Sequence, residues 1–362
     1  MRNFFLALMI LLSITGKSQK KAKPTTIHNF ATFLTKASMV SGKEILFNHV
    51  HIQDTIDFGN ASSVTQMLKI KSSRFDQSAS LKGVTYGDSV IISNMTFSTD
   101  LFFLKSNFGP SLSITDVVFE RQFAIRHSVL PQIIKMNRVS FPTNMTLDFS
   151  TNEVEGDKCL AQFQETDISQ IVLPYELFRF DFDEKNLEGN SYTHAQKARI
   201  YELLIRNSKE AGFVTSAEKW DIDYKKYMNE KEYGGVGNVF NFISENYWNF
   251  GYSKSTIFWV WTPVFFLLFF IINYFSIFWA IDLYHIKEIG EDINDTDETN
   301  LEDIIKQNRV RYALIYTGII YFGLKIDPKG IDISKGWGIV YPIIVYLIGT
   351  INILGCAGYL FK

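Results

Sequence analysis

A hydrophobic register that repeats every eleven residues constrains the fold of the first half of this chain more than any other feature. Large apolar residues stand at each step of this register: Phe75, Tyr86, Phe97, Phe108, Phe119, Leu130 and Phe141. Two further apolar residues follow each step after Phe75, four and six positions later, as in the pairs Val90/Ile92 and Leu112/Ile114. A spacing of two places both members of a pair on one face of a strand. Each repeat is therefore predicted to form a short strand followed by a turn.

A fixed period of this kind is typical of stacked repeats, which bury a common core only against their neighbours. The register extends back, with one-residue slips, through Leu68/Ile70, Ile56/Phe58 and Ile45/Phe47. A parallel β-solenoid with two repeats per coil and an antiparallel meander both fit this pattern. A meander commonly turns at Asn-Gly or Asp-Gly, and neither dipeptide occurs in the sequence. We therefore predict a mainly β solenoid over 40–185, similar to a right-handed parallel β-helix of eleven-residue repeats.

The segments on either side of the repeats have other patterns. Residues 1–18 contain Arg2, an apolar run and a small-x-small motif that ends at Ser18, which is typical of a cleaved signal peptide. Helical periodicity begins near Ser191, and residues 190–250 are predicted to form a helical hairpin followed by an aromatic helix at the outer membrane surface. The hairpin would cap the open end of the solenoid, because an uncapped coil exposes edge strands.

Two late stretches lack charged residues for more than twenty positions, which is long enough to cross a bilayer. We predict transmembrane helices over 255–281 and 336–361. The connecting residues 282–335 contain seven Lys and Arg residues, so this segment is predicted to face the cytoplasm and the solenoid to lie outside. Its apolar element 312–324 is short for a crossing, and we expect it to be re-entrant or interfacial against the two spans.

The residue pattern predicts no catalytic, cofactor or metal site. His49 and His51 would project from one face of a strand, but no third ligand with a recognisable spacing accompanies them. The acidic run from Glu288 to Asp303 lacks the glycine that a calcium loop requires at its sixth position. The net charge is −2 and no basic cluster is interleaved with aromatic residues, which excludes a nucleic-acid surface.

Several motifs follow one another in a distinctive order. They are an F-x3-L-x-F repeat, a helical stretch AQKARIYELLIRNSKEAG…AEKW, an aromatic approach YWNFGYSKST, the segment YFGLKID and a final YLIGTINILGCAGYLFK. This order resembles that of bacterial membrane-associated pentapeptide-repeat-like proteins. Strict five-residue A-(D/N)-L-x-x repeats are absent. Some proteins of this kind carry a C-terminal module similar to two-helix ion channels, so the resemblance implies a channel-like membrane part.

Together these observations predict a non-enzymatic, multi-pass protein of the bacterial inner membrane, with its solenoid facing the periplasm. Its partners would be the lipid bilayer and an envelope protein that the solenoid recognises or organises, while homo-oligomerisation is left open. The alternative is an oligomeric ion channel formed by the two spans and the short apolar element. An envelope enzyme is disfavoured because no acid–base or nucleophile pair is visible in the sequence.

Overall fold

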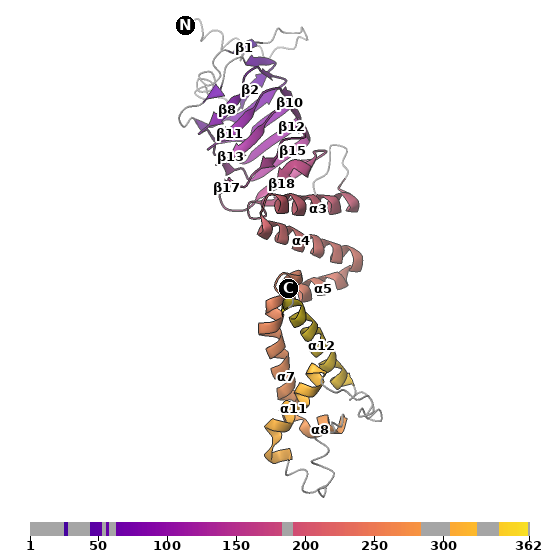
Figure 1. The fold of residues 1–362 in the computed structure, drawn as a ribbon. Helices are drawn as coiled ribbons and strands as arrows, with labels where there is room; N and C mark the ends of the chain where they lie inside the picture. Colours follow the sequence, from indigo (N-terminus) through magenta and orange to yellow (C-terminus); the bar gives the residue numbers. More distant parts are fainter. Residues whose placement is uncertain are drawn as a thin grey trace. The chain divides into compact units, whose positions relative to one another are not determined.

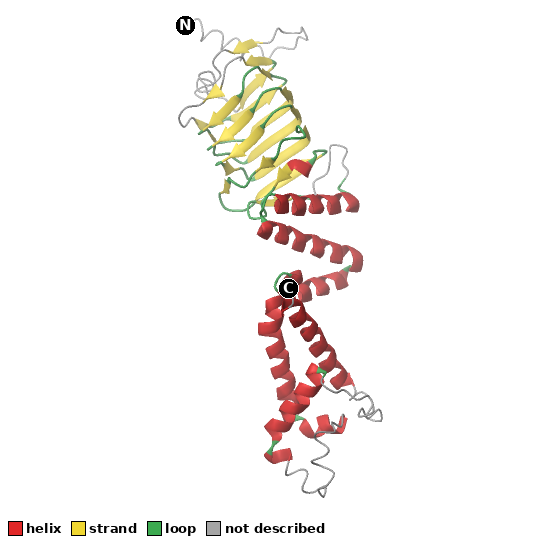
Figure 2. Cartoon of the chain, viewed as in Figure 1, coloured by secondary structure: helices red, strands yellow, loops and turns green. Residues whose placement is uncertain are grey.

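The computed structural model describes residues 25–27, 44–52, 56–57, 63–182, 191–283, 305–323 and 340–360. The chain divides into two compact units, Met1–Asp221 and Ile222–Lys362. The first unit holds the β-strands and helix α3, whereas the second is helical (Figures 1 and 2). The predicted signal peptide over 1–18 lies outside the described residues.

The first unit contains a parallel β-solenoid of about six turns between residues 44 and 180. Its main sheet has seven strands in the order β2-β6-β10-β12-β15-β18-β20. They span Glu44–Asn48, Met67–Lys71, Val90–Phe97, Ser111–Phe119, Ile133–Ser140, Cys159–Gln164 and Phe178–Phe180. A second sheet has the order β13-β11-β8-β4, with strands Phe123–Arg126, Leu101–Leu104, Ala79–Lys82 and Ile56–Asp57.

Short strands complete the remaining sides of the coils. They are β1 (Thr25–Ile27), β3 (Val50–Ile52), β5 (Ser63–Val64), β7 (Arg74–Phe75), β9 (Thr85–Tyr86), β14 (Val129–Leu130), β16 (Leu147–Asp148), β17 (Glu153–Val154) and β19 (Ile171–Val172). Every pairing among the described strands is parallel. The solenoid prediction is therefore confirmed, and the antiparallel meander is wrong.

The strand register shows how the eleven-residue period builds the coil. Val90 pairs with Leu112, and Leu112 pairs with Ile134, so each coil in this part advances by two repeats. The step is longer in the next coil, where Ile134 pairs with Ala161. It is shorter in the last, where Ala161 pairs with Phe180. These unequal steps explain why the sequence register fades after residue 150.

The repeat residues fill the interior of the coils. The paired residues between Val90 and Leu147 are all buried: Val90, Ile92, Leu101, Phe103, Leu112, Ile114, Phe123, Ile125, Ile134, Met136, Met145 and Leu147. Residues of the register that lie one coil apart stack on each other. The ring centroids of Phe75, Phe97, Phe119 and Phe141 follow at 5.2, 5.2 and 5.6 Å. Because each such pair contributes about 0.5–1.5 kcal/mol beyond area burial, this ladder ties successive coils together.

Left-handed backbone recurs once per coil along the main sheet. The residues with this conformation are His49, Ser72, Asn94, Asp116, Arg138 and Glu165, with φ between 45° and 55° in every case. A second set follows the other main side of the coil, at Gly83, Lys105 and His127. Left-handed residues bend a strand sharply, so these positions form the corners of the solenoid. The corner positions are polar residues or Gly of many types, and the hydrophobic sequence pattern therefore did not reveal them.

Helices cover the last coil. Helix α3 (His194–Glu210) starts at a capping box, in which Thr193 and Gln196 satisfy each other's backbone N–H groups. A 3-10 turn, η2 (Ile168–Gln170), lies beneath it. Asn207 Nδ2 donates to the carbonyl oxygens of Ile168 and Ile171 at 2.8 and 2.9 Å. In helix α4 (Val214–Tyr233), Trp220 Nε1 donates to the carbonyl oxygen of Leu173 at 3.0 Å. Carbonyl groups of the final coil therefore have partners from the helices.

The second unit contains helices on both sides of two gaps in the described residues. Its elements are α5 (Gly235–Trp248), η3 (Asn249–Gly251), α6 (Lys254–Thr256), the π-helical turn η4 (Ile257–Trp261), α7 (Thr262–Phe275), α8 (Ile277–Leu283), α11 (Arg309–Phe322) and α12 (Val340–Leu360). The continuous helix Lys254–Phe275 and α12 are long and apolar enough to cross a membrane. Helix α11 has 14 residues, which rise about 21 Å and fall short of a hydrocarbon core of about 30 Å.

One boundary differs from that predicted. The first candidate span ends at Phe275 rather than at residue 281, because the chain turns at Ser276 and begins the short helix α8. Ile277 and Ala280 of α8 are fully buried in the same apolar cluster as α11, which explains why an uninterrupted apolar run does not form one helix. The helix that contains the short apolar element, α11, begins at Arg309, and Gly323 ends it in the left-handed conformation.

Candidate functional site

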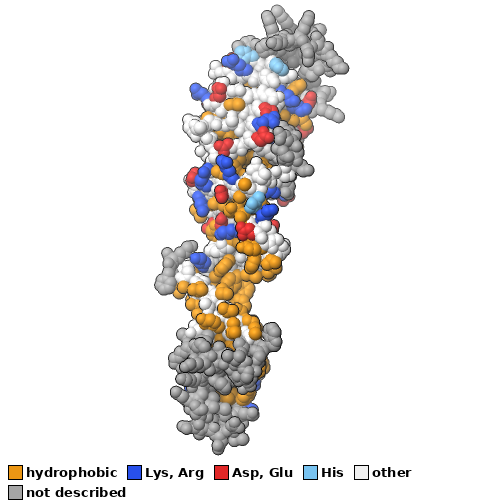
Figure 3. All heavy atoms as spheres, turned by 90° about the vertical axis from the view of Figure 1, so that its right-hand side faces the viewer, with side chains coloured by type: hydrophobic (Ala, Val, Ile, Leu, Met, Phe, Trp, Pro, Cys, Tyr) orange, Lys and Arg blue, Asp and Glu red, His pale blue; other side chains and the backbone are white. Residues whose placement is uncertain are grey.

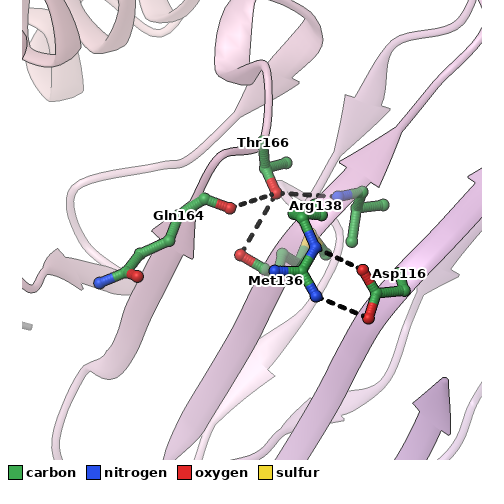
Figure 4. A network of polar contacts seen from close by, with 6 residues as sticks. Asp116, Met136, Arg138, Gln164 and Thr166 are labelled. Atoms are coloured by element: carbon green, nitrogen blue, oxygen red, sulfur yellow. Dashed lines mark hydrogen bonds and ion pairs between the residues drawn. The ribbon is translucent and has the colours of Figure 1, made fainter. Parts of the chain in front are cut away.

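Charged side chains are scattered over the solenoid and gather over helices α3 and α4, while hydrophobic side chains dominate the described surface of the later helices (Figure 3). The clearest charged pair on the solenoid joins two neighbouring corners. Arg138 Nε and a terminal nitrogen of its guanidinium donate to the two carboxylate oxygens of Asp116 at 2.5 and 2.8 Å (Figure 4). The hydrogen bond from Arg138 lowers the pKa of the Asp116 carboxyl. This bidentate geometry fixes both side chains at the surface.

Side-chain hydroxyl groups form hydrogen bonds with the backbone at the corners. Thr166 follows the left-handed residue Glu165, and its Oγ1 accepts from the backbone N–H of Val139 at 3.2 Å. The same hydroxyl lies 3.0 Å from the carbonyl oxygen of Gln164, to which it donates, and 3.3 Å from that of Met136 (Figure 4). A strand kinked at a corner loses ladder partners, and the hydroxyl replaces them.

The same arrangement recurs at the second row of corners. Ser128 follows the left-handed His127, accepts from Ser106 N at 3.1 Å and donates to the carbonyl of Arg126 at 2.9 Å. Asn152 accepts from Ser128 N at 3.0 Å and donates to the carbonyl of Ile125 at 2.8 Å. These buried hydroxyl and amide groups are structural, and they make the solenoid a stiff body.

The two histidines considered as ligands do not share a strand. Strand β2 ends at Asn48, and His49 occupies a left-handed corner before β3, so the expectation that both project from one face of a strand is wrong. His51 pairs with Asp76, whose other oxygen accepts from Arg74 Nε at 3.0 Å. Over the described ranges, no group of three or more His, Cys, Asp or Glu residues could hold a metal ion. The acidic run 288–303 lies outside those ranges.

Polar side chains join helices α7, α11 and α12 of the second unit. Asn273 of α7 donates to Thr317 Oγ1 of α11 at 2.7 Å, and the hydroxyl of Tyr341 in α12 donates to Asn273 Oδ1 at 2.7 Å. Asn273 and Thr317 are fully buried. Such groups cost free energy in an apolar environment unless they bond to each other, and here they do.

A second polar chain connects α5 to the same helices. Tyr247 of α5 donates to Asn352 Oδ1 of α12, and Asn352 Nδ2 donates to the hydroxyl of Tyr321 in α11 at 2.5 Å. The Tyr321 hydroxyl in turn lies 3.3 Å from the carbonyl oxygen of Thr262 at the start of α7. Asn352 is fully buried. Sequence reasoning missed both sets of contacts, although isolated Asn and Tyr residues inside apolar runs were their visible signal.

Glycines allow these helices to approach closely. A Cβ at Gly349 would lie 2.6 Å from the carbonyl carbon of Tyr321, so α12 and α11 touch backbone to backbone there. A Cβ at Gly355 would lie 2.7 Å from the Ile257 side chain. Both small residues therefore allow close contacts between helices of one chain.

Cations from other segments cover the carboxyl ends of both candidate spans. Arg309 donates to the carbonyl oxygens of Tyr274 and Phe275 at 2.5 and 2.8 Å, at the end of α7. Lys254 Nζ lies 3.5 Å from the carbonyl oxygen of Gly358, in the last turn of α12. Positive charge at a helix carboxyl end is favourable because the last carbonyls carry partial negative charge.

Comparison with known proteins finds no match to the chain among protein-family models, curated proteins or solved structures. The resemblance to pentapeptide-repeat-like membrane proteins therefore stays a prediction. The rigid solenoid and the polar contacts of the apolar helices are the features on which a function can rest.

Proposed function

We propose that this chain is a non-enzymatic scaffold or recognition protein, anchored in a bacterial inner membrane by its helices and presenting its solenoid to the periplasm. One observation carries the proposal: a helix-capped solenoid with a charged surface belongs to the same chain as two helices that are long and apolar enough to cross a membrane. A stacked coil offers a stiff, extended surface without a catalytic pocket.

The outward side chains of the main sheet support a recognition role. Residues in register on successive coils form straight rows, such as Lys69, Ile91, Ser113, Lys135 and Gln162. Neighbouring strands lie about 4.8 Å apart, so such a row places different side chains at regular intervals. Alternating charged, apolar and polar groups on a rigid lattice suit a protein partner.

The membrane placement is part of the same proposal. The predicted signal peptide over 1–18 would export the solenoid, and the basic residues of 282–335 would hold that segment in the cytoplasm. Helix α11 would then be a re-entrant element between the spans, since it is short and packs against both α7 and α12. The coils are proposed to wind right-handed, as parallel crossovers do.

Cysteine labelling in whole and lysed cells tests the placement. Single cysteines are introduced at Asn144, at Asp297 and after Lys362, with Cys356 replaced by Ala. Cys159 is buried, and burial raises the pKa of its thiol to about 12, so it stays unreactive in the folded chain. The proposal expects labelling from outside at the first and third sites and only after lysis at Asp297. Labelling of the last site from inside instead would make α11 a true crossing.

Site-specific photocrosslinking tests the recognition role. A photoreactive residue replaces Val118, which projects from β12 with 42% of its surface exposed, in the full chain in living cells. We expect a crosslinked protein of one defined mass. The same residue at Leu268 in α7 is the control, because the proposal assigns that side chain to lipid. If photoreactive residues at Val118 and at the outward positions of the main sheet all gave no crosslinked protein, the scaffold role would be contradicted.

A channel is the second candidate function, and one observation favours it. Helix α11 is a half-length helix held between two candidate spans by Asn273, Thr317 and Tyr321. Half-length helices of this kind line ion pathways in some membrane proteins. Single-channel recording of the purified full chain in planar bilayers decides between the two functions. Silence across gradients of monovalent ions of both signs would eliminate the channel.

A further inference from the structure

Helix α5 packs with its polar side inward. Asn241 is buried and accepts from Asn229 Nδ2 of α4 at 2.8 Å, and Lys226 of α4 donates to Glu245 at 2.9 Å. A Cβ at Gly237 would lie 2.6 Å from the carbonyl carbon of Asn229, so the two helices touch along this side. The polar face of α5 is therefore the face that protein covers, which is the reverse of an ordinary amphipathic helix in a soluble protein.

The opposite face of α5 is an uncovered apolar stripe. It consists of Val236, Val239, Phe240 and Ile243, which follow one another at helical spacing, together with the neighbouring Phe242. Phe242 is 69% exposed and Val239 is 56% exposed. Contiguous apolar surface of this kind is rare on soluble proteins and marks a place where lipid or another protein binds.

The position of the stripe along the second unit identifies lipid as its occupant. Helix α5 ends six residues before the candidate span that starts at Lys254, and Trp261 in that span donates to the carbonyl of Asn246 at 3.0 Å. The rings of Tyr247 and Trp261 lie 5.8 Å apart. Trp and Tyr residues at the end of a span mark the boundary between acyl chains and headgroups. Helix α5 thus contacts, through Asn246 and Tyr247, the part of the unit that would lie at this boundary.

The charge of α5 indicates which lipids the stripe accepts. Its only charged side chain is Glu245, which is already paired with Lys226. The rest of its polar face consists of Gly, Asn and Ser residues. A helix that binds through anionic lipid needs Lys or Arg along this face. In α5, apolar insertion alone supplies the attraction.

We propose that α5 lies in the plane of the outer leaflet as a wedge, with its Val239–Phe240–Ile243 face among the acyl chains, and that it inserts equally into uncharged and anionic lipid. The inference rests on the membrane placement proposed above. It goes further than the predicted aromatic helix at the outer membrane surface, because it assigns the face of the helix that enters the lipid and states that binding does not depend on headgroup charge.

Nitroxide labels on the full chain test this assignment in nanodiscs. Single cysteines at Val239, Phe240 and Ile243 report on the stripe, in a chain that carries Cys159→Ala and Cys356→Ala. Asn238, an exposed polar residue of the same helix, is the matched control, and Leu268 in α7 reports on the span. Collision rates with oxygen, which concentrates in lipid, are compared with those of a water-soluble nickel chelate. The nanodiscs contain phosphatidylcholine alone or phosphatidylcholine with an anionic phospholipid.

We expect oxygen to dominate at the three stripe positions and nickel at Asn238, by several-fold, with the same result in both lipid mixtures. Nickel access at the stripe with oxygen access at Leu268 would overturn the wedge and leave the span in place. Nickel access at Leu268 as well would overturn the membrane placement itself. Protection of the stripe from both reagents would indicate a protein neighbour and refute the lipid assignment, and insertion only with anionic lipid would refute the headgroup inference.

Discussion

The contact between Gly349 and Tyr321 leads to the sharpest prediction, because it joins two helices through their backbones. Gly349→Ala would place a Cβ 2.6 Å from the Tyr321 carbonyl carbon and nearer still to its oxygen. Carbon atoms in van der Waals contact lie about 3.5–4.0 Å apart, so α11 and α12 must separate locally by about 1 Å. Neither partner is a flexible side chain that could turn away.

The cost of this separation follows from what lies beside it. Overpacking of a rigid contact costs about 1–3 kcal/mol, and the neighbouring bond from Asn352 Nδ2 to the Tyr321 hydroxyl, now 2.5 Å long, would be lost. Hydrogen bonds between helices in membranes contribute about 0.6 kcal/mol each. We therefore expect Gly349→Ala to lower the free energy of unfolding of the second unit by about 2–4 kcal/mol.

Unfolding of the full chain by sodium dodecyl sulfate in mixed micelles, followed by Trp fluorescence, measures this loss. Gly318→Ala is the matched control, since a Cβ at this α11 position meets no atom within 4 Å. It should be neutral or slightly stabilising, because Ala favours a helix over Gly by up to about 1 kcal/mol. Equal stability of Gly349→Ala and the unsubstituted chain would refute the close contact.

Four further changes address the solenoid, each measured as urea unfolding of the full chain in nanodiscs, followed by the circular dichroism of the β-sheet. Lys105→Gly should stabilise by about 0.5–1 kcal/mol, because the left-handed backbone at this corner strains any residue with a Cβ; a loss of stability would contradict the corner geometry. Tyr86→Phe should stabilise by about 1 kcal/mol, since the buried hydroxyl has no hydrogen-bond partner among the described residues; destabilisation would reveal a hidden partner. Asn152→Ala should cost about 2–3 kcal/mol, because Ser128 N and the carbonyl of Ile125 lose their partner; a neutral result would show that water replaces the amide. Asp116→Asn should reduce stability above about pH 4, the usual carboxyl pKa, and the difference should vanish as the pH falls through the lowered pKa of Asp116; a difference that grew in acid would reverse the sign of the argument.

The regular part of the fold was predictable because every coil repeats the same physical requirement. Phe97 and Phe119 must face inward to bury their rings, and a spacing of two repeats stacks them directly. The corners were not predictable, since polar residues as different as Asp116, Arg138 and Lys105 adopt left-handed backbone there, and such residues are common on any solvent-facing position. Tertiary stacking, rather than local propensity, holds them in this conformation.

The second unit was predictable in composition but not in its contacts. Uncharged runs located two apolar helices but not the break at Ser276. Tertiary contacts accompany this break: Arg309, which is distant in sequence, binds the Phe275 carbonyl, and Ile277 is buried in a cluster with α11. The pairing of Asn273 with Thr317 is likewise a tertiary fact, because periodicity does not show which polar residues of two helices meet. For α5 the apolar stripe was visible in the sequence, whereas its inward polar face was not.

The cations at the carboxyl ends of the two candidate spans have a consequence for biosynthesis. The carbonyls of Tyr274 and Phe275 are covered by Arg309, which a ribosome adds 35 and 34 residues later. Lys254, at the start of the first span, is made 104 residues before the α12 carbonyl that it approaches. Helix α7 can therefore reach these terminal contacts only after Arg309 of α11 has been made, and α12 only after its own last turn has been made. A nascent chain halted after α8 would therefore leave the carbonyls of Tyr274 and Phe275 without their contacts from Arg309.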